Sequence, residues 1–260
     1  MGDIPWQHHC LEREGWVATL TLSRPPVNAL SREMVRELVA AAGALAADDS
    51  VSVVLIRSDQ RHFCAGADLK ERGAIAPDQV SAVVAAIRDC FDTITRLPQP
   101  TIAAVHGSAL GGGELALACD LRIMAEDVRF GFSETSLGII PGAGGTQRLP
   151  RLIGLSKAKE LIFTARILDS AECLELGLAD RVVPADDLHQ AAHDYAGELA
   201  RNAPLALRAA KQAIIQGLER PMEEGLRAEG EAYNSLIHTQ DREEGLRAFL
   251  EKRPPEWKGE

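Results

Sequence analysis

The stretch that decides the fold runs from residue 101 to residue 146 and reads TIAAVHGSALGGGELALACDLRIMAEDVRFGFSETSLGIIPGAGGT. Its hydrophobic pattern predicts a strand over 101–105, a glycine turn, and a short helix that opens at Glu114. A second strand over 121–125 follows. Parallel strands joined in this way place ligand chemistry at the strand ends of an α/β domain.

Two carboxylates flank the glycine turns of this stretch. Glu114 follows three glycines, and Glu134 lies in a loop before a second glycine turn over 142–145. Glycine tolerates positive φ and has no Cβ, so backbone amides in such turns can approach a ligand. Glu114 can also be read as a helix-start acid, and Glu134 as an ordinary loop acid. Their shared setting makes both candidates for acid/base chemistry on a carbonyl compound, with burial raising the pKa of Glu114.

Working outward, the remaining sequence alternates strands and helices up to residue 149. Strands are expected over 17–22 and 51–56, the second buried on both faces, and helices from the Ser31 cap and over 77–97. Beyond residue 149 the pattern is helical, and only 181–183 is expected to be extended. We therefore predict a core over 1–200 and a helical region over 201–260, which serves as a lid or oligomer interface and is not an independent domain.

Composition excludes several classes of protein. The 260 residues are 46% hydrophobic and carry a net charge of -10, which argues against a nucleic-acid surface. The five cysteines are odd in number and widely spaced, so we expect free thiols in a reducing compartment, with Cys64 and Cys119 buried.

No apolar run is long enough for a membrane span, and the N-terminus lacks the pattern of a signal peptide. A cytoplasmic protein is expected.

Some motifs admit other interpretations. Gly111, Gly113 and Ala116 match the dinucleotide fingerprint G-x-G-x-x-A, although a second glycine loop upstream, over 65–67, argues against it. His189 and His193 stand four residues apart on a helix, as zinc ligands can, but a solvated face is the simpler interpretation, and no metal is expected. His62 and His106 flank the glycine loops, where either could touch a ligand.

Three strings of the sequence resemble a known family: FCAGADLKER, GSALGGGELALACD and FSETSLGIIPGAGGTQRLP. Together they resemble the enoyl-CoA hydratase/isomerase (crotonase) family over nearly the whole chain. Within it, ADLKER, LSKAKELIFTARIL and AFLEKRPPEWKGE are most similar to the methylglutaconyl-CoA hydratase branch. The resemblance implies a spiral of β-β-α turns whose helical C-terminal region builds a homotrimer or a dimer of trimers.

The resemblance also implies the chemistry. Backbone amides of Ala67 and Gly111 would form an oxyanion hole for the thioester oxygen of an acyl-CoA, and Glu114 and Glu134 would share one water. In this assignment Glu134 exchanges the proton with Cα and Glu114 activates the water, although the roles could be exchanged. The family usually has one residue between its three glycines and the acid. Here that residue is missing, which leaves Gly112 as an alternative to Gly111.

Further positions match the family's substrate contacts. The resemblance implies that coenzyme A, as part of the substrate, is the only cofactor-like group. A dicarboxylic acyl group such as 3-methylglutaconyl would need a cation, for which Lys70 and Arg72 are candidates unless they are solvated loop charges. The positions expected at the substrate are Arg24, Ala65, Asp68, Leu69, Lys70, Gly142, Phe249 and Lys252.

A general short-chain enoyl-CoA hydratase is the alternative activity, and RNA binding is a remote one. A relative in the same branch binds AU-rich RNA through a lysine-bearing helix near its N-terminus. The matching helix here, SREMVRELVAAAGALAAD, has no lysine and only Arg32 and Arg36. We therefore expect an acyl-CoA partner, and neither a nucleic acid nor a membrane.

Overall fold

The computed structural model describes residues 6–218 and 220–260, and its first half repeats one unit. Each turn of the chain gives a long strand, a short strand and a helical segment, which confirms the predicted spiral of β-β-α turns. The elements of this half are β1 (His9–Glu14), β2 (Val17–Leu22), β3 (Ala29–Leu30), α1 (Arg32–Ala46), β4 (Val53–Ser58), β5 (Gly66–Ala67), α2 (Leu69–Gly73), α3 (Pro77–Thr95), β6 (Thr101–Val105), β7 (Ser108–Ala109), α4 (Gly113–Ala118), β8 (Leu121–Ala125), β9 (Arg129–Gly131) and the 3-10 helix η1 (Glu134–Leu137).

The second half is mostly helical, as predicted. It contains α5 (Gly145–Ile153), α6 (Leu155–Thr164), β10 (Ile167–Leu168), α7 (Ser170–Glu175), β11 (Arg181–Val183), η2 (Ala185–Asp187), α8 (Leu188–Ala200), α9 (Pro204–Leu218), α10 (Met222–Leu236) and α11 (Gln240–Glu251). The expectation that only 181–183 is extended here was wrong, because β10 also pairs with β9. A two-residue strand lacks the alternation that would reveal it. Within the described ranges, no helix is long and apolar enough to cross a membrane.

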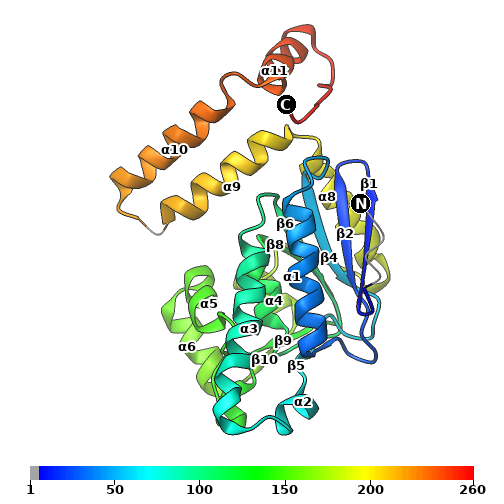
Figure 1. Cartoon of the computed structure of the whole chain (residues 1–260), viewed down its shortest axis with the longest axis vertical. Helices are drawn as coiled ribbons and strands as arrows, with labels where there is room; N and C mark the ends of the chain where they lie inside the picture. The colour runs from blue at the N-terminus through cyan, green and yellow to red at the C-terminus, as the bar shows by residue number, and fades with distance from the viewer. Residues whose placement is uncertain (1–5, 219) are drawn as a thin grey trace.

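The long strands form one six-stranded sheet in the order β1-β2-β4-β6-β8-β11. All neighbours are parallel except β1 and β2, which form an antiparallel hairpin. The short strands form two small sheets of their own, β3-β5 and β10-β9-β7. Helices α1 and α3 cover one face of the large sheet and α8 the other (Figure 1).

Strand β4 shows why the sheet needs helices on both faces. Val54 and Ile56 pack into the core beneath α1 and α3, whereas Val53 and Leu55 pack against α8. All four are almost completely buried, which confirms the prediction from their continuous apolar run. On the first helix, the Ser31 side chain accepts a hydrogen bond from the amide of Met34, so Ser31 is the predicted N-cap.

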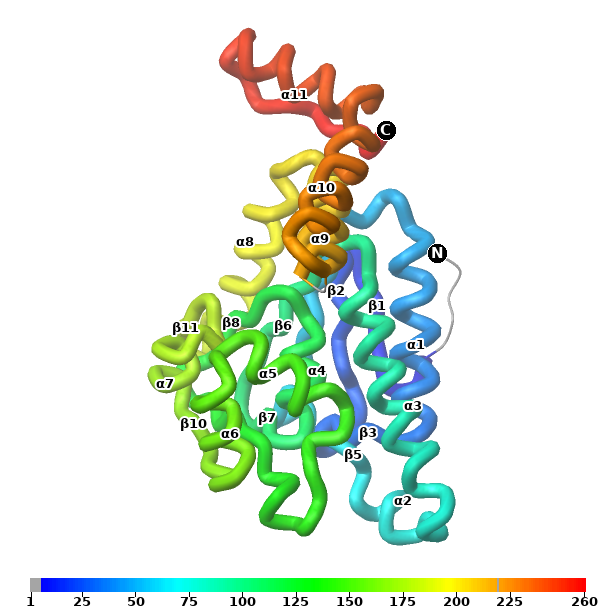
Figure 2. Tube along the Cα trace, turned by 90° about the vertical axis from the view of Figure 1, so that its left-hand side faces the viewer, coloured from blue at the N-terminus to red at the C-terminus, as the bar shows by residue number. Residues whose placement is uncertain are grey.

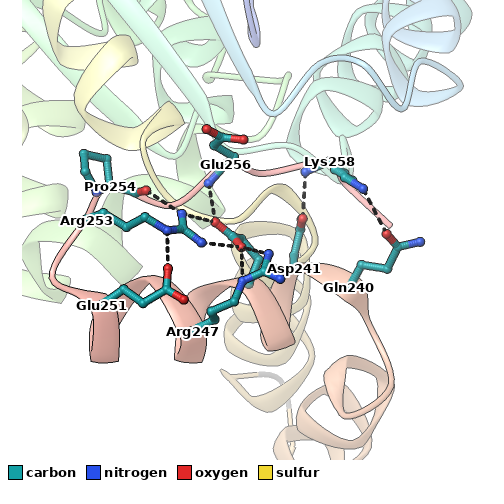
Figure 3. Close-up of polar contacts among 9 residues, drawn as sticks. Gln240, Asp241, Arg247, Glu251, Arg253, Pro254, Glu256 and Lys258 are labelled. Atoms are coloured by element: carbon teal, nitrogen blue, oxygen red, sulfur yellow. Dashed lines mark hydrogen bonds and ion pairs between the residues drawn. The ribbon is translucent and has the colours of Figure 1, made fainter.

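Helices α9, α10 and α11 extend away from the rest of the chain (Figures 1 and 2). Helices α9 and α10 pack side by side, and the C-terminal tail folds back along α11. Figure 3 shows what holds this tail. Glu244 receives the guanidinium of Arg253 at 2.6 Å and the amide of Glu256 at 2.9 Å, and Asp241 accepts the amide of Lys258 at 2.7 Å.

Candidate active site

Three predicted site residues lie at or just after the short strands β5, β7 and β9. Ala67 ends β5, Gly111 follows β7 by two residues, and Glu134 follows β9 by three. Together with Glu114 of α4 and Gly142, they line one small cavity of about 70 Å³. The structure therefore brings both predicted glutamates and both predicted amide donors to the same place.

Glu114 is held rigidly at the start of α4. Its Oε1 accepts hydrogen bonds from the amides of Ala143 at 2.8 Å and Gly145 at 2.7 Å. The residue is only 5% exposed, and this burial raises the pKa of Glu114 from 4.5 to about 7 despite the two amides. A carboxyl group with such a pKa can gain or lose a proton near neutral pH, as a general acid or base must.

Glu134 lies half-buried at the start of η1. Its pKa is also raised, mainly by burial, while the charge of Arg72 acts in the opposite direction. The backbone around it is fixed: the hydroxyl of Thr135 donates to the carbonyl of Ile162 at 2.6 Å, and the amide of Ile139 donates to the carbonyl of Glu134. The Oε2 atom is buried and has no hydrogen-bond partner among residues 6–218 and 220–260. A buried carboxylate oxygen without a partner is uncommon in folded proteins.

The shortened glycine loop keeps Gly111 at the cavity. In the described part of the chain, the Gly111 amide donates no hydrogen bond to a protein acceptor. Gly112 instead faces the upstream glycine loop that includes residues 65–67. An added Cβ on Gly112 would collide with the carbonyl oxygen of Cys64 just before that loop. Of the two amide candidates that the sequence left open, Gly111 is therefore the one that lines the cavity.

The second glycine turn does a different job from the one expected. The amides of Ala143 and Gly145 bind Glu114, so they do not face a ligand as the sequence analysis predicted. The turn is held from behind by Arg148, whose Nη1 donates to the carbonyl of Ala143 at 3.0 Å and which also pairs with Asp92 of α3. Reasoning from sequence missed Arg148, because its partner lies 56 residues earlier in the chain.

The positions expected at the substrate fall into three groups. Arg24 and Asp68 form an ion pair of 2.8 Å next to β5, and Gly142 lines the cavity. Exposed side chains of the same region include Ala65, Leu69 and Lys70, and none of these three lines the cavity. Phe249 and Lys252 belong to α11 and its C-cap, and α11 lies at the opposite end of the molecule from α2 (Figures 1 and 2).

Several candidates from the sequence have structural roles. His62 accepts the amide of Ser108, and His106 bonds the carbonyl of Gln60, so both tie loops together rather than facing the cavity. Of the cysteines, four are buried, and all five are free. No cluster of metal-binding side chains occurs in the residues described, around His189 and His193 included.

The apolar wall of the cavity was not anticipated from sequence. The sequence shows that these residues are apolar, but the same pattern is typical of ordinary core positions. Only the placement of the helices shows that they line a cavity. The wall is formed by Leu30, Val84, Ile87, Phe91, Ile139 and Ile140.

Known proteins share both the sequence and the fold. The family model for enoyl-CoA hydratase/isomerase matches residues 12–260. The mitochondrial methylglutaconyl-CoA hydratase of Mus musculus is 48% identical over 97% of this chain and 82% of its own, and the enoyl-CoA isomerase/hydratase fer4 of Mycosarcoma maydis is 44% identical over 92% of each. The crystal structure of an enoyl-CoA hydratase from Bacillus anthracis superposes with a TM-score of 0.95 at 45% identity, covering 98% of this chain and 100% of that one. The chain therefore belongs to the enoyl-CoA hydratase/isomerase family.

Proposed function

We propose that this protein is a hydro-lyase that adds water to, or removes it from, the Cα=Cβ bond of an acyl-CoA thioester. The observation that carries the proposal is the meeting of Glu114, Glu134, Ala67 and Gly111 at one cavity. Enzymes of this family that carry both acids are expected to hydrate. The family membership and the names of the relatives support the same activity.

In the hydration direction, the thioester oxygen accepts hydrogen bonds from the amides of Ala67 and Gly111. These amides stabilise the negative charge that grows on that oxygen as the enolate-like state forms, and one such donor is worth about 3 kcal/mol. Glu114 accepts a proton from the water whose oxygen bonds to Cβ, and Glu134 delivers a proton to Cα. The pair begins and ends with one proton, so the reverse reaction uses the same groups.

The proposed substrate is 3-methylglutaconyl-CoA, with 3-hydroxy-3-methylglutaryl-CoA as its hydrated form, in leucine or isovalerate metabolism. Relatives named methylglutaconyl-CoA hydratase, 48% identical over most of the chain, support this choice. A general short-chain enoyl-CoA hydratase is the second candidate, supported by relatives named only as enoyl-CoA hydratases. The chemistry is proton transfer and water addition, so the proposal includes no cofactor beyond the CoA of the substrate.

We place the CoA moiety along the surface around the Arg24–Asp68 pair, near Ala65, Leu69 and Lys70. Phe249 and Lys252 would then reach a CoA site on a neighbouring subunit of a trimer or a dimer of trimers. Large apolar side chains exposed along the C-terminal helices support such an assembly. They are Ile214, Leu218, Met222, Leu226, Tyr233, Leu246, Phe249 and Leu250.

A cytoplasmic location is also proposed, supported by the five free cysteines. Several relatives carry the word mitochondrial in their names, so targeting differs among family members. Fractionation of the source cells would decide the location of this protein.

The direct test of the activity uses purified protein with crotonyl-CoA and 3-methylglutaconyl-CoA. We expect hydration of both, with a higher kcat/KM on the second, and a loss of about 10²-fold or more in Glu114→Gln and in Glu134→Gln. Glu126→Gln, an exposed acid beside β8, is the matched control. A smaller loss in either glutamine variant would contradict the acid/base assignment, and a strong preference for crotonyl-CoA would remove the dicarboxylic substrate.

A further inference from the structure

The two loops that carry the proposed oxyanion-hole amides are joined to each other outside the cavity. The upstream loop follows β4 and ends at Ala67, and the downstream loop follows β6 and leads through β7 to Gly111. Both amides lie beyond the six-stranded sheet, so the sheet alone does not set the distance between them. That distance depends on the cross-links between the loops, and catalysis by two amides depends on that distance.

Hydrogen bonds between the loops include two that are made by histidine rings. The Ser108 amide donates to Nδ1 of His62 at 3.1 Å, and Nε2 of His106 donates to the carbonyl of Gln60 at 2.7 Å. The amide of Phe63 also donates to the carbonyl of His106, at 3.1 Å. The two histidines lie outside the set of residues that line the cavity, so they act on it through the backbone that they hold.

The two histidine links respond to protonation in opposite ways. An imidazole nitrogen accepts a hydrogen bond only while it carries no proton, so the Ser108 amide requires a neutral His62 with its proton on Nε2. The Gln60 carbonyl instead requires a proton on Nε2 of His106, which both the neutral ring and the imidazolium can supply. A second proton on each ring therefore removes the link of His62 and leaves that of His106 intact.

A protonated His62 has another acceptor beside it. A Cβ built on Gly107 would lie 2.5 Å from the carbonyl oxygen of Arg61 and 2.7 Å from Nδ1 of His62, so these two atoms lie next to the same point. The Arg61 carbonyl favours the charged ring, because it can accept the added proton in a hydrogen bond. The ring thus has a partner in each state: the Ser108 amide when it is neutral and the Arg61 carbonyl when it is charged.

Charged and titratable groups reach His62 from several elements. Burial lowers the pKa of His62 below its ordinary 6.5, and the charges of Arg61 on its own loop and of His106 after β6 act in the same direction. Asp127, in the turn between β8 and β9, raises it. His189 of α8 stacks edge-on against His106, with the ring centroids 5.9 Å apart. The Ser108 link is therefore present near neutral pH and is lost as pH falls below 6.5.

We propose that His62 is a positioning residue for the oxyanion hole: its neutral ring fixes the spacing of the Ala67 and Gly111 amides, and its protonation releases that spacing. The inference rests on the proposed hydratase function and goes beyond it, since no step of that function uses a histidine. His62 acts by holding Ser108, three residues before Gly111, against the backbone that leads to Ala67.

The test combines two substitutions of His62 with a pH profile on the thioester that the wild type hydrates faster. His62→Asn keeps a side-chain acceptor that does not titrate, so kcat at pH 8 should stay within about 3-fold of wild type. His62→Leu removes the acceptor and should lower kcat and kcat/KM equally, by about 10-fold, because the interaction matters only in the transition state. Between pH 8 and pH 5.5, kcat of the wild type should fall about 5-fold more than that of His62→Asn.

His189→Asn is the matched control, because it removes an exposed histidine that stacks on His106 from outside the two loops. Its pH profile should follow that of the wild type. Nitrogen-15 NMR of the histidine rings adds a measurement that does not depend on activity, and it should show His62 with its proton on Nε2 at pH 8. Thermal unfolding of each variant separates a loss of spacing from a loss of structure.

Three outcomes would overturn the role of His62 and leave the hydratase assignment standing. In the first, His62→Leu retains the wild-type kcat. In the second, His62→Asn and the wild type lose kcat equally between pH 8 and pH 5.5. In the third, the NMR spectra place the proton of His62 on Nδ1 at pH 8. A wild type inactive on every thioester would instead contradict the proposed function, and this positioning role with it.

Discussion

Gly66 and Gly111 lie in direct backbone contact. A Cβ built on Gly66 would stand 2.7 Å from Cα of Gly111, although the two residues are 45 positions apart in the printed sequence. Gly66 also has a φ of +88°, where a side chain is strained. Because Ala67 directly follows Gly66, this contact sets the spacing between the two amides proposed to hold the thioester oxygen.

The first prediction concerns this contact. Gly66→Ala should push the two glycine loops apart and lower kcat/KM about 10²-fold, since an error of about 1 Å in such a site has that effect. Gly43→Ala is the control, because Gly43 lies in the last turn of α1, its Cβ would meet nothing within 4 Å, and the exchange should stabilise the helix by up to about 1 kcal/mol. Steady-state kinetics and thermal unfolding of both variants check this. Unchanged kinetics in Gly66→Ala would contradict the proposed placement of the oxyanion.

The second prediction concerns stability and pH. The pKa of Glu114 is about 7 in the folded protein against an ordinary 4.5, so the folded state binds this proton more tightly than the unfolded state. Its contribution to the free energy of unfolding is therefore lost as pH rises from 4.5 to 7, by on the order of 3 kcal/mol. Glu114→Gln carries no such group. Its stability relative to wild type should rise between pH 5 and pH 8.

Denaturant titrations at both pH values, at one protein concentration, measure this difference. The exposed Glu126→Gln variant should show no comparable change. A Glu114→Gln variant whose stability relative to wild type does not rise between pH 5 and pH 8 would contradict the raised pKa of Glu114.

The third prediction concerns the pH profile of hydration. The reactive pair needs one proton in total, so kcat/KM should fall when both groups are protonated and again when both are ionised. Burial raises the pKa of both glutamates, that of Glu114 to about 7, so the rate should decline as pH rises past about 7. Profiles of the wild type between pH 5 and pH 9 test this. A flat profile above pH 7 would contradict a shared proton.

The fourth prediction assigns Arg148 a positioning role. Its guanidinium holds the carbonyl of Ala143, whose own amide holds Glu114, and its positive charge lowers the pKa of Glu114. Arg148→Met should therefore lower kcat about 10-fold or more and move the alkaline limb of the profile to higher pH. Arg148→Lys should move the alkaline limb less than Arg148→Met does, because lysine keeps the positive charge. A loss of rate with no movement of the limb would indicate only a general loss of structure.

The fifth prediction concerns assembly. If the apolar side chains of α9–α11 pack against other subunits, a charge among them should weaken the assembly. We expect Leu226→Asp, on the exposed part of α10, to lower the mass measured by light scattering, and Glu231→Asp to leave it unchanged. A wild-type chain that is monomeric at micromolar concentration would contradict the trimer.

The sequence by itself determined the class of the fold and most of its elements. The apolar runs of β2, β6 and β8 and the Ser31 cap are local features, and each lies where the pattern predicted, whereas β4 begins at Val53 and ends at Ser58, two residues later than the expected 51–56. The hairpin strand β1 and the short strands β9 and β10 escaped prediction. Strand β1 is too polar to show a period although it pairs with the adjacent β2, whereas β9 and β10 are too short to show one and pair across more than 30 residues.

For the site, the sequence supplied the types and positions of the residues, and only the tertiary structure decided their partners. The grouping of Glu114 with Glu134 followed from motif and spacing. Motif and spacing did not predict the hydrogen bonds from Ala143 and Gly145 to Glu114, nor the choice of Gly111 over Gly112. Both depend on contacts between loops that lie far apart in the sequence. The same reason explains why only the folded chain distinguished Arg72, beside the glutamates, from the exposed Lys70 two residues earlier.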